Sequence, residues 1–344
     1  MNDSRVALAV PRRTAESLRR SLREANLLDP GRKIARKGGT VLIPVVSLPP
    51  MDLAAYGAEV VVDSSILERP PKRTPFDMIS EAAPIEARLK EQLPRAWERL
   101  GDVLIIRLPQ ELEVHAEDVA ETYARVLGVK AVLQDVHGVA GDWRLPSARK
   151  LWGGETETIH LEDGVRLKLD PAKVMFSSGN FRERVRMSRA CRPGEVVVDM
   201  FAGIGYFSVP MAVHSRPGKI FSCEVNPEAL HYLEENIRIN RVQSIRPLFG
   251  DCRRVAPEGV ADRVIMGYLR AQDHLGKAFR VVGESGLIHY HEACPCELED
   301  ERPWGTVREQ ARMAGRKVEL EKFQRLKSYA PGVSHVVLDV RVTS

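Results

Sequence analysis

The stretch that decides the fold is residues 196–210, V-V-V-D-M-F-A-G-I-G-Y-F-S-V-P. Its three consecutive valines predict a strand that is buried on both faces. Gly203 and Gly205 allow a tight turn and the close approach of a ligand, which a Cβ atom would obstruct. The apolar run that starts at Tyr206 is compatible with a helix. A strand, a glycine turn and a helix N-terminus together place free backbone N–H groups beside a ligand pocket.

Carboxylates follow three successive predicted strands. The pattern predicts strands at 196–199, 219–225, 245–249, 261–266 and 286–290. Asp199 and Glu224 end the first two of these strands, and Asp251 follows the third. Ligands of open α/β sheets bind outside the carboxyl ends of the strands, so three acids there indicate a ligand site. Asp199 could bind an amino group or order the loop, Glu224 could bind ribose hydroxyls, and Asp251 could accept a hydrogen bond from an adenine amino group.

A dinucleotide site would require a third glycine near Ser208, and none is present. The pattern D-x-F-x-G-x-G-x-F resembles instead the first motif of class I S-adenosylmethionine (SAM) enzymes. The alternative, a structural strand–turn–helix of another α/β protein, does not account for the three acids. The resemblance implies an α/β fold. We expect a Rossmann-like SAM-dependent catalytic domain, preceded by a small α+β domain and an N-terminal β-α-β-β module.

Composition indicates a globular protein of two or three domains, with 344 residues, 44% of them hydrophobic and 28% charged. No apolar run approaches the ~20 residues that span a bilayer. The N-terminus is charged early and lacks the apolar core of a signal peptide. We therefore expect a cytoplasmic protein whose five cysteines are reduced.

Positive charge is unevenly distributed along the chain. Residues 1–50 hold ten Lys/Arg and four Asp/Glu, a net charge of +6, so the rest of the chain carries +4 − 6 = −2. Residues 173–192 hold six Lys/Arg and one Glu. Two basic segments in a nearly neutral chain favour a polyanion partner over ordinary solubilising charge, because one of them adjoins the predicted pocket.

Segments rich in Pro and Gly divide the chain into four predicted parts. They are a basic module at 1–47 for the polyanion partner, a proline-rich linker at 48–75, a small α+β domain at 76–172 and a SAM-binding catalytic domain at 173–344. Within the third part we expect a helix at 85–100 and a hairpin at 156–170, whose Asp163-Gly164 pair suits a two-residue primed turn.

A polar loop precedes the basic helix of the catalytic domain. Ser177, Ser178 and Asn180 can offer polar groups to the amino-acid arm of a ligand, and Arg184 can pair with a carboxylate or a phosphate. Phe201 could contact adenosine or the sulfonium, although core packing is equally consistent with its position. Cys252, beside Asp251, is predicted to line the pocket wall.

The order of these parts resembles the archaeal and eukaryotic family that modifies position 37 in the tRNA anticodon loop. The resemblance covers most of the chain. Its motifs are Phe176-Ser177, Glu183-Arg184, D-M-F-A-G-I-G-Y-F, E-V-N-P at 224–227, Gly250-Asp251, I-H-Y-H-E at 288–292 and S-Y-A-P-G at 328–332. One branch methylates guanosine-37 at N1. The other, in wybutosine synthesis, transfers the 3-amino-3-carboxypropyl (acp) group of SAM to carbon 7 of 4-demethylwyosine in tRNA(Phe) and leaves methylthioadenosine.

Two positions favour the acp-transferring branch. The methylating branch has Asn-Leu-Pro where this chain has Gly267-Tyr268-Leu269, and an arginine where it has Gly179. Both differences remove polar groups that would hold guanine, and both are similar to the acp-transferring branch. Methylation of guanosine-37 N1, or of the wyosine precursor, remains the alternative. An inactive tRNA-binding factor is a rival of a different class.

Other features leave the chemistry open. The acceptor carbon must lose a proton, and Glu292, Asp251 and His289 are the candidate bases, with nothing in the sequence to choose among them. The run His289-x-His291-x2-Cys294-x-Cys296 could be considered for zinc. Because both histidines project from one face of a predicted strand, we expect no metal. We also expect a monomer.

Overall fold

The computed structural model describes residues 6–63, 66–69, 73–141 and 143–344. The chain forms two compact units, Met1–Asp77 and Met78–Ser344. Among the described residues, no helix has the length and apolar character needed to cross a membrane.

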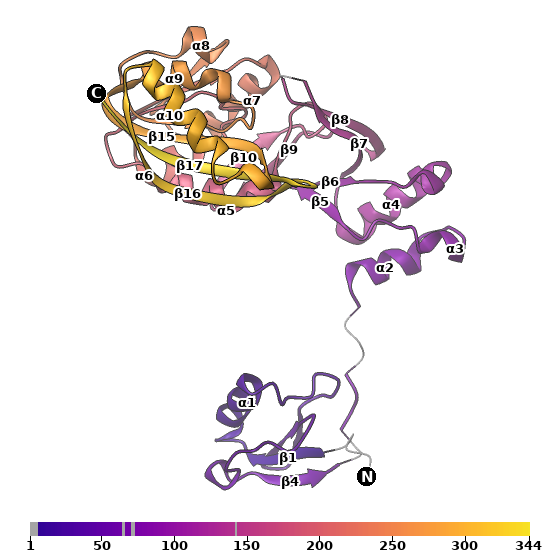
Figure 1. Ribbon diagram of the computed structural model, residues 1–344. Helices are drawn as coiled ribbons and strands as arrows, with labels where there is room; N and C mark the ends of the chain where they lie inside the picture. Colours follow the sequence, from indigo (N-terminus) through magenta and orange to yellow (C-terminus); the bar gives the residue numbers. More distant parts are fainter. Residues whose placement is uncertain (1–5, 64–65, 70–72, 142) are drawn as a thin grey trace. The chain divides into compact units, whose positions relative to one another are not determined.

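The N-terminal unit is a four-stranded antiparallel sheet covered by one helix (Figure 1). Its elements are β1 Val6–Pro11, α1 Ala15–Glu24, β2 Ala35–Lys37, β3 Thr40–Pro44, the 3₁₀ turn η1 Ala54–Tyr56 and β4 Glu59–Val62. Leu18 and Leu22 of α1 pack on Leu8 and Ile43 of the sheet. The expected β-α-β-β module is present, but the expectation of little structure in the linker at 48–75 is wrong. β4 lies inside that range and pairs with β1, because its valines supply another strand for the sheet.

The small α+β part of the second unit has a four-stranded sheet in the order β5-β6-β7-β8. Its elements are α2 Pro75–Ala82, α3 Ala87–Lys90, β5 Trp97–Leu100, β6 Val103–Ile106, η2 Gln110–His115, α4 Ala116–Leu127, β7 Ala131–Ala140 and β8 Leu145–Gly153. The expected helix at 85–100 is wrong: α3 is one turn long, and residues 97–100 form β5. Pro94 cannot continue a helix, which explains the break.

A separate hairpin follows, β9 Thr158–Glu162 and β10 Val165–Leu169. Asp163 and Gly164 both have positive φ, 48° and 79°, as a primed turn requires. The side chain of Asn236 accepts from Lys168 N at 2.6 Å and donates to Lys168 O at 3.1 Å. Val165 and Leu167 share a core with the catalytic sheet. The hairpin therefore packs with the catalytic domain, and the expected boundary at residue 172 lies too late.

The catalytic domain is built on a seven-stranded sheet in the order β13-β12-β11-β14-β15-β17-β16. Its strands are β11 Val196–Asp199, β12 Lys219–Glu224, β13 Ile245–Phe249, β14 Ala261–Met266, β15 Val282–Pro295, β16 Lys317–Ala330 and β17 Val333–Thr343. Its helices are η3 Ser178–Asn180, α5 Phe181–Ser188, α6 Ser208–Ser215, α7 Pro227–Ile239, α8 Cys252–Val255, η4 Gln272–His274, α9 Leu275–Val281, η5 Cys296–Leu298 and α10 Arg302–Met313. Strands β11 to β15 run parallel, and β17 is antiparallel to both its neighbours.

Residues of the central strands alternate between two cores. Val198 and Val264 face the core that α9 and α10 cover, whereas Val197 and Ile265 face the core that α5, α6 and α7 cover. Figure 1 shows α9 and α10 on the opposite side of the sheet from α5 and α6. Both faces of the sheet are covered, as the three consecutive valines of β11 predicted.

A chain of charged and polar side chains crosses the sheet on one face. Arg263 on β14 pairs with Glu195 at 3.0 Å and donates to Nε2 of His289 on β15 at 2.5 Å. His289 Nδ1 then donates to Asp339 on β17 at 2.5 Å. Arg186 of α5 completes the chain, because it binds Asp339 at 2.6 Å and Glu183 at 2.6 Å. We call Glu195, Arg263, His289, Asp339, Arg186 and Glu183 the cross-strand network.

Candidate active site

A pocket of about 600 Å³ lies at the carboxyl ends of the parallel strands, within the second unit. All but one of the predicted site residues line it: Ser177, Arg184, Phe201, Gly203, Glu224, Asp251, Cys252 and Gly267. Ser178 is exposed and lies outside the lining. The pocket lies at the sheet edge where the open-sheet rule places ligands.

The glycine turn is held closed by Glu224. The Glu224 carboxylate accepts from Gly203 N at 2.7 Å and also from Val225 N and Asn226 N, at 2.9 and 2.7 Å. Gly203 has φ 57°, a conformation that favours glycine. Burial raises the pKa of Glu224, and the three N–H donors oppose that effect. The three N–H groups use three of the roughly four acceptor sites of the carboxylate, so Glu224, which lines the pocket, has room to accept from about one hydroxyl group of a ligand.

Asp199 does not reach the pocket. Its side chain is fully buried and accepts from Ser208 Oγ at 2.6 Å and from Phe201 N at 3.3 Å. Burial raises its pKa to about 6. Of the two roles that the sequence left open for Asp199, ordering of the loop is the one the geometry supports.

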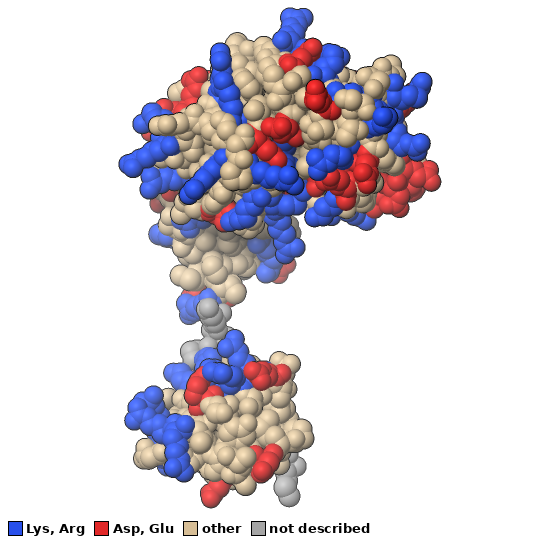
Figure 2. Space-filling model, turned by 90° about the vertical axis from the view of Figure 1, so that its left-hand side faces the viewer, with Lys and Arg blue, Asp and Glu red and all other residues tan. Residues whose placement is uncertain are grey.

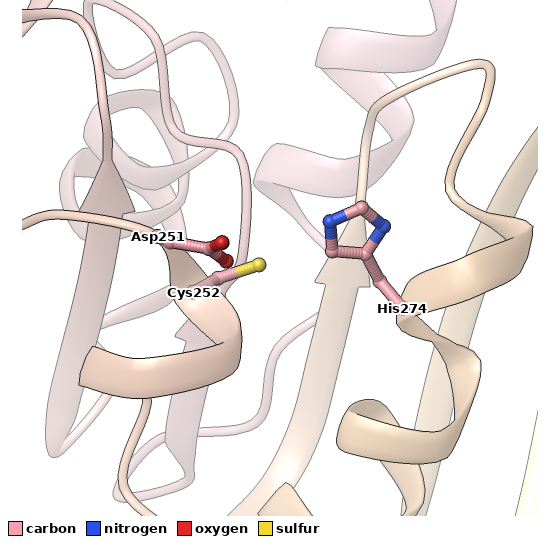
Figure 3. A group of neighbouring side chains, drawn as sticks. All are labelled: Asp251, Cys252 and His274. Carbon is pink, nitrogen blue, oxygen red and sulfur yellow. The ribbon is translucent and has the colours of Figure 1, made fainter.

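Asp251, Cys252 and His274 converge from two segments at one end of the pocket (Figure 3). Their potential ligand atoms lie within 4.8 Å of one another. However, Arg253 already binds Asp251 at 2.6 Å, and this hydrogen bond lowers the pKa of the carboxyl to about 2. Burial raises the pKa of Cys252 to about 12, so the sulfur is a thiol rather than the thiolate a metal requires. These residues suit a pocket wall better than a metal site.

The run from His289 to Cys296 has other structural roles. His289 belongs to the cross-strand network, and His291 Nδ1 contacts His335 Nε2 at 3.1 Å. Cys294 is buried in the apolar core, whereas Cys296 Sγ contacts Ser334 Oγ at 3.2 Å.

Aromatic residues line the middle of the pocket. The Phe201 ring packs against Tyr268 and His274, with ring centroids 5.3 and 5.0 Å apart. Gly267 is backed by Phe207, and a Cβ atom on Gly267 would lie 2.7 Å from Phe207 Cε2. The glycine therefore leaves room for an aromatic ring in the wall where a larger residue would collide with it.

Arg184 is tied to neighbouring groups of the protein. It is 3% exposed, forms two hydrogen bonds with the Glu162 carboxylate and donates to Ser177 O at 2.6 Å. Its guanidinium also lies 4.7 Å from the Phe176 ring centroid. This geometry makes Arg184 the support of the Ser177 loop, and three of its five N–H donors are used within the protein.

Sequence reasoning missed several lining residues. Trp143 and Arg144 reach the pocket from the turn between β7 and β8, and Lys327 and His335 reach it from β16 and β17. The two turn residues adjoin β8, which was not predicted. Lys327 directly precedes the S-Y-A-P-G motif, but nothing in its spacing indicated that it faces the pocket.

Two of the three candidate bases lie outside the pocket lining. Glu292 is fully buried and bound by Arg302 and Tyr290, and His289 is bound on both ring nitrogens. Asp251 lines the pocket, but its low pKa makes it a weak base. The structure therefore favours none of them as the proton acceptor.

Three family models match the chain in order. The tRNA methyltransferase 5 N-terminal domain matches residues 7–51, and the TYW2 N-terminal domain matches residues 77–156. The TRM5/TYW2 methyltransferase domain matches residues 158–320, a range that includes the β9–β10 hairpin.

Two relatives from the genus Pyrococcus represent the two branches. The chain is 42% identical to the P. horikoshii tRNA(Phe) (4-demethylwyosine(37)-C(7)) aminocarboxypropyltransferase, over 77% of this chain and 95% of that one. It is 36% identical to the P. abyssi tRNA (guanine(37)-N(1))-methyltransferase Trm5b, over 98% of this chain and 99% of that one.

Solved structures agree with both relationships. The crystal structure of P. abyssi Trm5b matches 99% of this chain and 100% of its own, with a TM-score of 0.77 and 34% identity. P. horikoshii TYW2, in complex with MeSAdo, matches 78% of this chain and 99% of its own, with a TM-score of 0.71 and 40% identity. The resemblance inferred from the motifs is confirmed, and the chain belongs to the TRM5/TYW2 family.

Proposed function

We propose that the protein transfers the acp group of SAM to carbon 7 of 4-demethylwyosine at position 37 of tRNA(Phe), in wybutosine synthesis. The observation that carries the proposal is the pair of glycines beside the pocket, Gly179 and Gly267. Neither offers a polar side chain to a guanine edge, whereas the motifs of the methylating branch have Arg and Asn at these positions. The 42% identity to a relative named for this reaction supports the same branch.

The pocket suits SAM in size and in the chemistry of its wall. Glu224 stands at the glycine turn, where it can accept from ribose hydroxyls. Asp251 is ionised and can accept from the adenine amino group, and Phe201 offers an apolar face. The related TYW2 structure contains MeSAdo, the methylthioadenosine that remains once the acp group has left SAM. When bound, SAM supplies a sulfonium with three electrophilic carbons.

Position alone selects the carbon that reacts, because the nucleophile must lie in line with it at about 3–3.5 Å. In the proposed reaction, carbon 7 forms a bond with Cγ of the acp group as the Cγ–S bond breaks. The thioether leaves with the electron pair, and carbon 7 then loses its proton. The wall from Ser177 to Asn180 would therefore determine the outcome by how it holds the amino-acid arm.

A tRNA substrate agrees with the charge of the N-terminal unit. Arg19, Arg23, Arg32 and Arg69 surround a hollow of about 390 Å³ there. Figure 2 shows Lys and Arg side chains gathered on one side of this unit. Such groups bind phosphates by releasing condensed counterions. We infer that this unit binds tRNA while the pocket receives the anticodon loop. A tRNA substrate also favours a cytoplasmic location.

One experiment tests the reaction. SAM labelled in either the methyl carbon or the carboxyl carbon is incubated with the protein and precursor tRNA(Phe) that contains 4-demethylwyosine. The proposal expects carboxyl label in tRNA and methylthioadenosine as the co-product. Methyl label in tRNA with S-adenosylhomocysteine would overturn it, and no transfer of either label would favour an inactive tRNA-binding factor.

Methylation of guanosine-37 N1 is the second candidate. The match to the tRNA methyltransferase 5 N-terminal domain, and coverage of 99% of P. abyssi Trm5b, are the observations in its favour. The first concerns the N-terminal end of the chain and the second nearly its whole length, but the identity to the acp-transferring relative is higher, 42% against 36%, and the two glycines concern the reacting centre. We therefore rank acp transfer first. Unmodified tRNA with guanosine-37, offered in the same assay, separates the two candidates.

A further inference from the structure

Lys327 is a pocket cation with no carboxylate partner among the described residues. It lies on β16, is partly buried, and donates a hydrogen bond from Nζ to Ser177 Oγ at 3.3 Å. Of the other four lining cations, Arg144 and Arg270 also form no ion pair among the described residues, and the remaining two are paired. Arg184 is paired with Glu162, and Arg253 is paired with Asp251.

Gly179 provides the space that this ammonium occupies. A Cβ atom on Gly179 would lie 2.8 Å from Lys327 Nζ, closer than such atoms approach one another. The φ of Gly179 is not in the left-handed region, so the backbone does not itself require glycine there. Because Nζ is the far end of a flexible side chain, a Cβ at this position would shift the ammonium rather than the backbone.

A hydrogen-bond acceptor completes the site. Asn180 lines the same pocket, and its Oδ1 is a buried oxygen without a hydrogen-bond partner. An orphaned buried acceptor is uncommon in a folded protein and calls for a donor from a ligand. The group thus offers an ammonium and a hydroxyl to an anion, and a carbonyl to a cation. An α-amino acid carries that pair of charges on one carbon.

We propose that Lys327 binds the carboxylate of the acp arm of SAM while the side-chain carbonyl of Asn180 binds its ammonium. The proposal rests on the proposed use of SAM and adds the residue that holds the transferred group. With both substituents of the α-carbon held, a single methylene separates that carbon from Cγ. The orientation of Cγ toward the acceptor base is then set by Lys327, and Gly179 makes this possible.

The electrostatics of the site agree with the geometry. Burial lowers the pKa of Lys327 and the charge of Arg184 lowers it further, whereas the charge of Glu98 opposes them. Without a ligand, this ammonium is partly desolvated and faces another cation. A carboxylate in hydrogen-bond contact would favour the charged form of the lysine and would be attracted in turn.

The test compares three ligands that differ in the arm alone. Calorimetry would measure the binding of SAM, decarboxylated SAM and methylthioadenosine to the full-length protein and to Lys327→Met. Hydrogen bonds to charged groups predict that Lys327→Met loses about 10- to 100-fold in affinity for SAM. Affinity for the two ligands without a carboxylate should stay within about twofold, because neither has the group that Lys327 would bind.

Two further variants sharpen the result. Lys322→Met is the matched control, an exposed lysine on the same strand, and should leave all three affinities unchanged. Gly179→Ala should weaken SAM alone, since its Cβ displaces Nζ. Unchanged SAM affinity in Lys327→Met, or an equal loss for all three ligands, would overturn the proposal. This comparison measures ligand binding, so its result does not depend on which carbon of SAM is transferred. The labelled-SAM assay tests the transferred carbon independently.

Discussion

Arg184 and Glu162 form a buried ion pair that joins α5 to the β9–β10 hairpin, with hydrogen bonds of 2.5 and 2.7 Å. The guanidinium is 3% exposed and the carboxylate 10%. A pair of this kind does not need to add net stability, but removing one partner leaves a buried charge alone. The ion pair therefore makes the pocket loop depend on a hairpin that the pocket does not contact.

Glu162→Ala should lower the free energy of unfolding by about 3–5 kcal/mol, because Arg184 remains buried and unpaired. Denaturant unfolding measures the change. Glu155→Ala, at an exposed position, is the control and should change stability by less than about 0.5 kcal/mol. A Glu162→Ala variant as stable as the parent would show that Arg184 finds another partner.

Stability should also fall in acid through Glu162. Burial opposes the effect, but hydrogen bonds from Arg184 and His160 lower the pKa of this carboxyl to about 2. A Glu in the unfolded chain titrates near 4.3. A lowered folded-state pKa stabilises the fold fully above about pH 4.3, and this contribution is lost as the pH falls toward 2. The difference in unfolding free energy between parent and Glu162→Gln should narrow over that window, and a constant difference would contradict the assignment.

Glu224→Ala should weaken SAM binding by about 10- to 100-fold, as expected for the removal of hydrogen bonds to a charged group. The substitution also releases the N–H groups of Gly203 and Asn226, so part of the effect comes from the turn. Calorimetry with SAM measures the affinity. Glu234→Ala, an exposed acid on α7, serves as the control. Equal affinities in both variants would mean that Glu224 has no contact with the ligand.

Gly267→Asn should not convert the protein to a methyltransferase. The added Cβ would lie 2.7 Å from Phe207 Cε2, so the ring must move before the amide can face a base. We expect lower acp transfer with methylthioadenosine still the co-product. Chromatography of the nucleoside products decides, and S-adenosylhomocysteine from this variant alone would show that position 267 selects the carbon. Gly305→Asn, where a Cβ meets nothing within 4 Å, is the control.

Arg23 and Arg69 should contribute to tRNA binding through phosphates. Replacing both with Ala should weaken binding and reduce the dependence of log K on log salt by about 1 for each phosphate that is no longer neutralised. SAM affinity should not change, because the hollow lies in the other unit. Arg88→Ala, an exposed arginine of the second unit, is the control. An unchanged salt slope would remove this hollow from the tRNA surface.

Local patterns predicted the parts of the catalytic domain in which chain order and spatial order agree. The strands at 245–249 and 261–266 were predicted to the residue, and Glu224 and Asp251 lie at the pocket because parallel strands end at one edge. Pairing between strands that are distant in the chain was harder to predict from the sequence. β4 was read as linker because its partner β1 lies some fifty residues earlier.

Site residues were missed for the same reason. Lys327 lies on β16, which is the edge strand at the opposite end of the sheet from β13. Its place at the pocket depends on the pairing of β16 with β17, and local sequence does not reveal that pairing. Arg184 was expected to contact a ligand, and nothing in its own neighbourhood showed that Glu162 would already bind it. Sequence spacing indicates which residues share an edge, but tertiary packing decides which charges stay available.

The cross-strand network has a consequence for how the domain tolerates change. Arg263, His289 and Asp339 come from three different strands, and each accepts or donates only when its neighbours are in register. A slip of one residue in any of those strands would turn its member to the opposite face and leave a buried charge unmatched. Misaligned versions of the sheet are thereby penalised more strongly than apolar contacts alone could achieve. Substitutions in this row should be acceptable only as coordinated sets, so directed evolution of the domain should find single changes there among the rarest survivors.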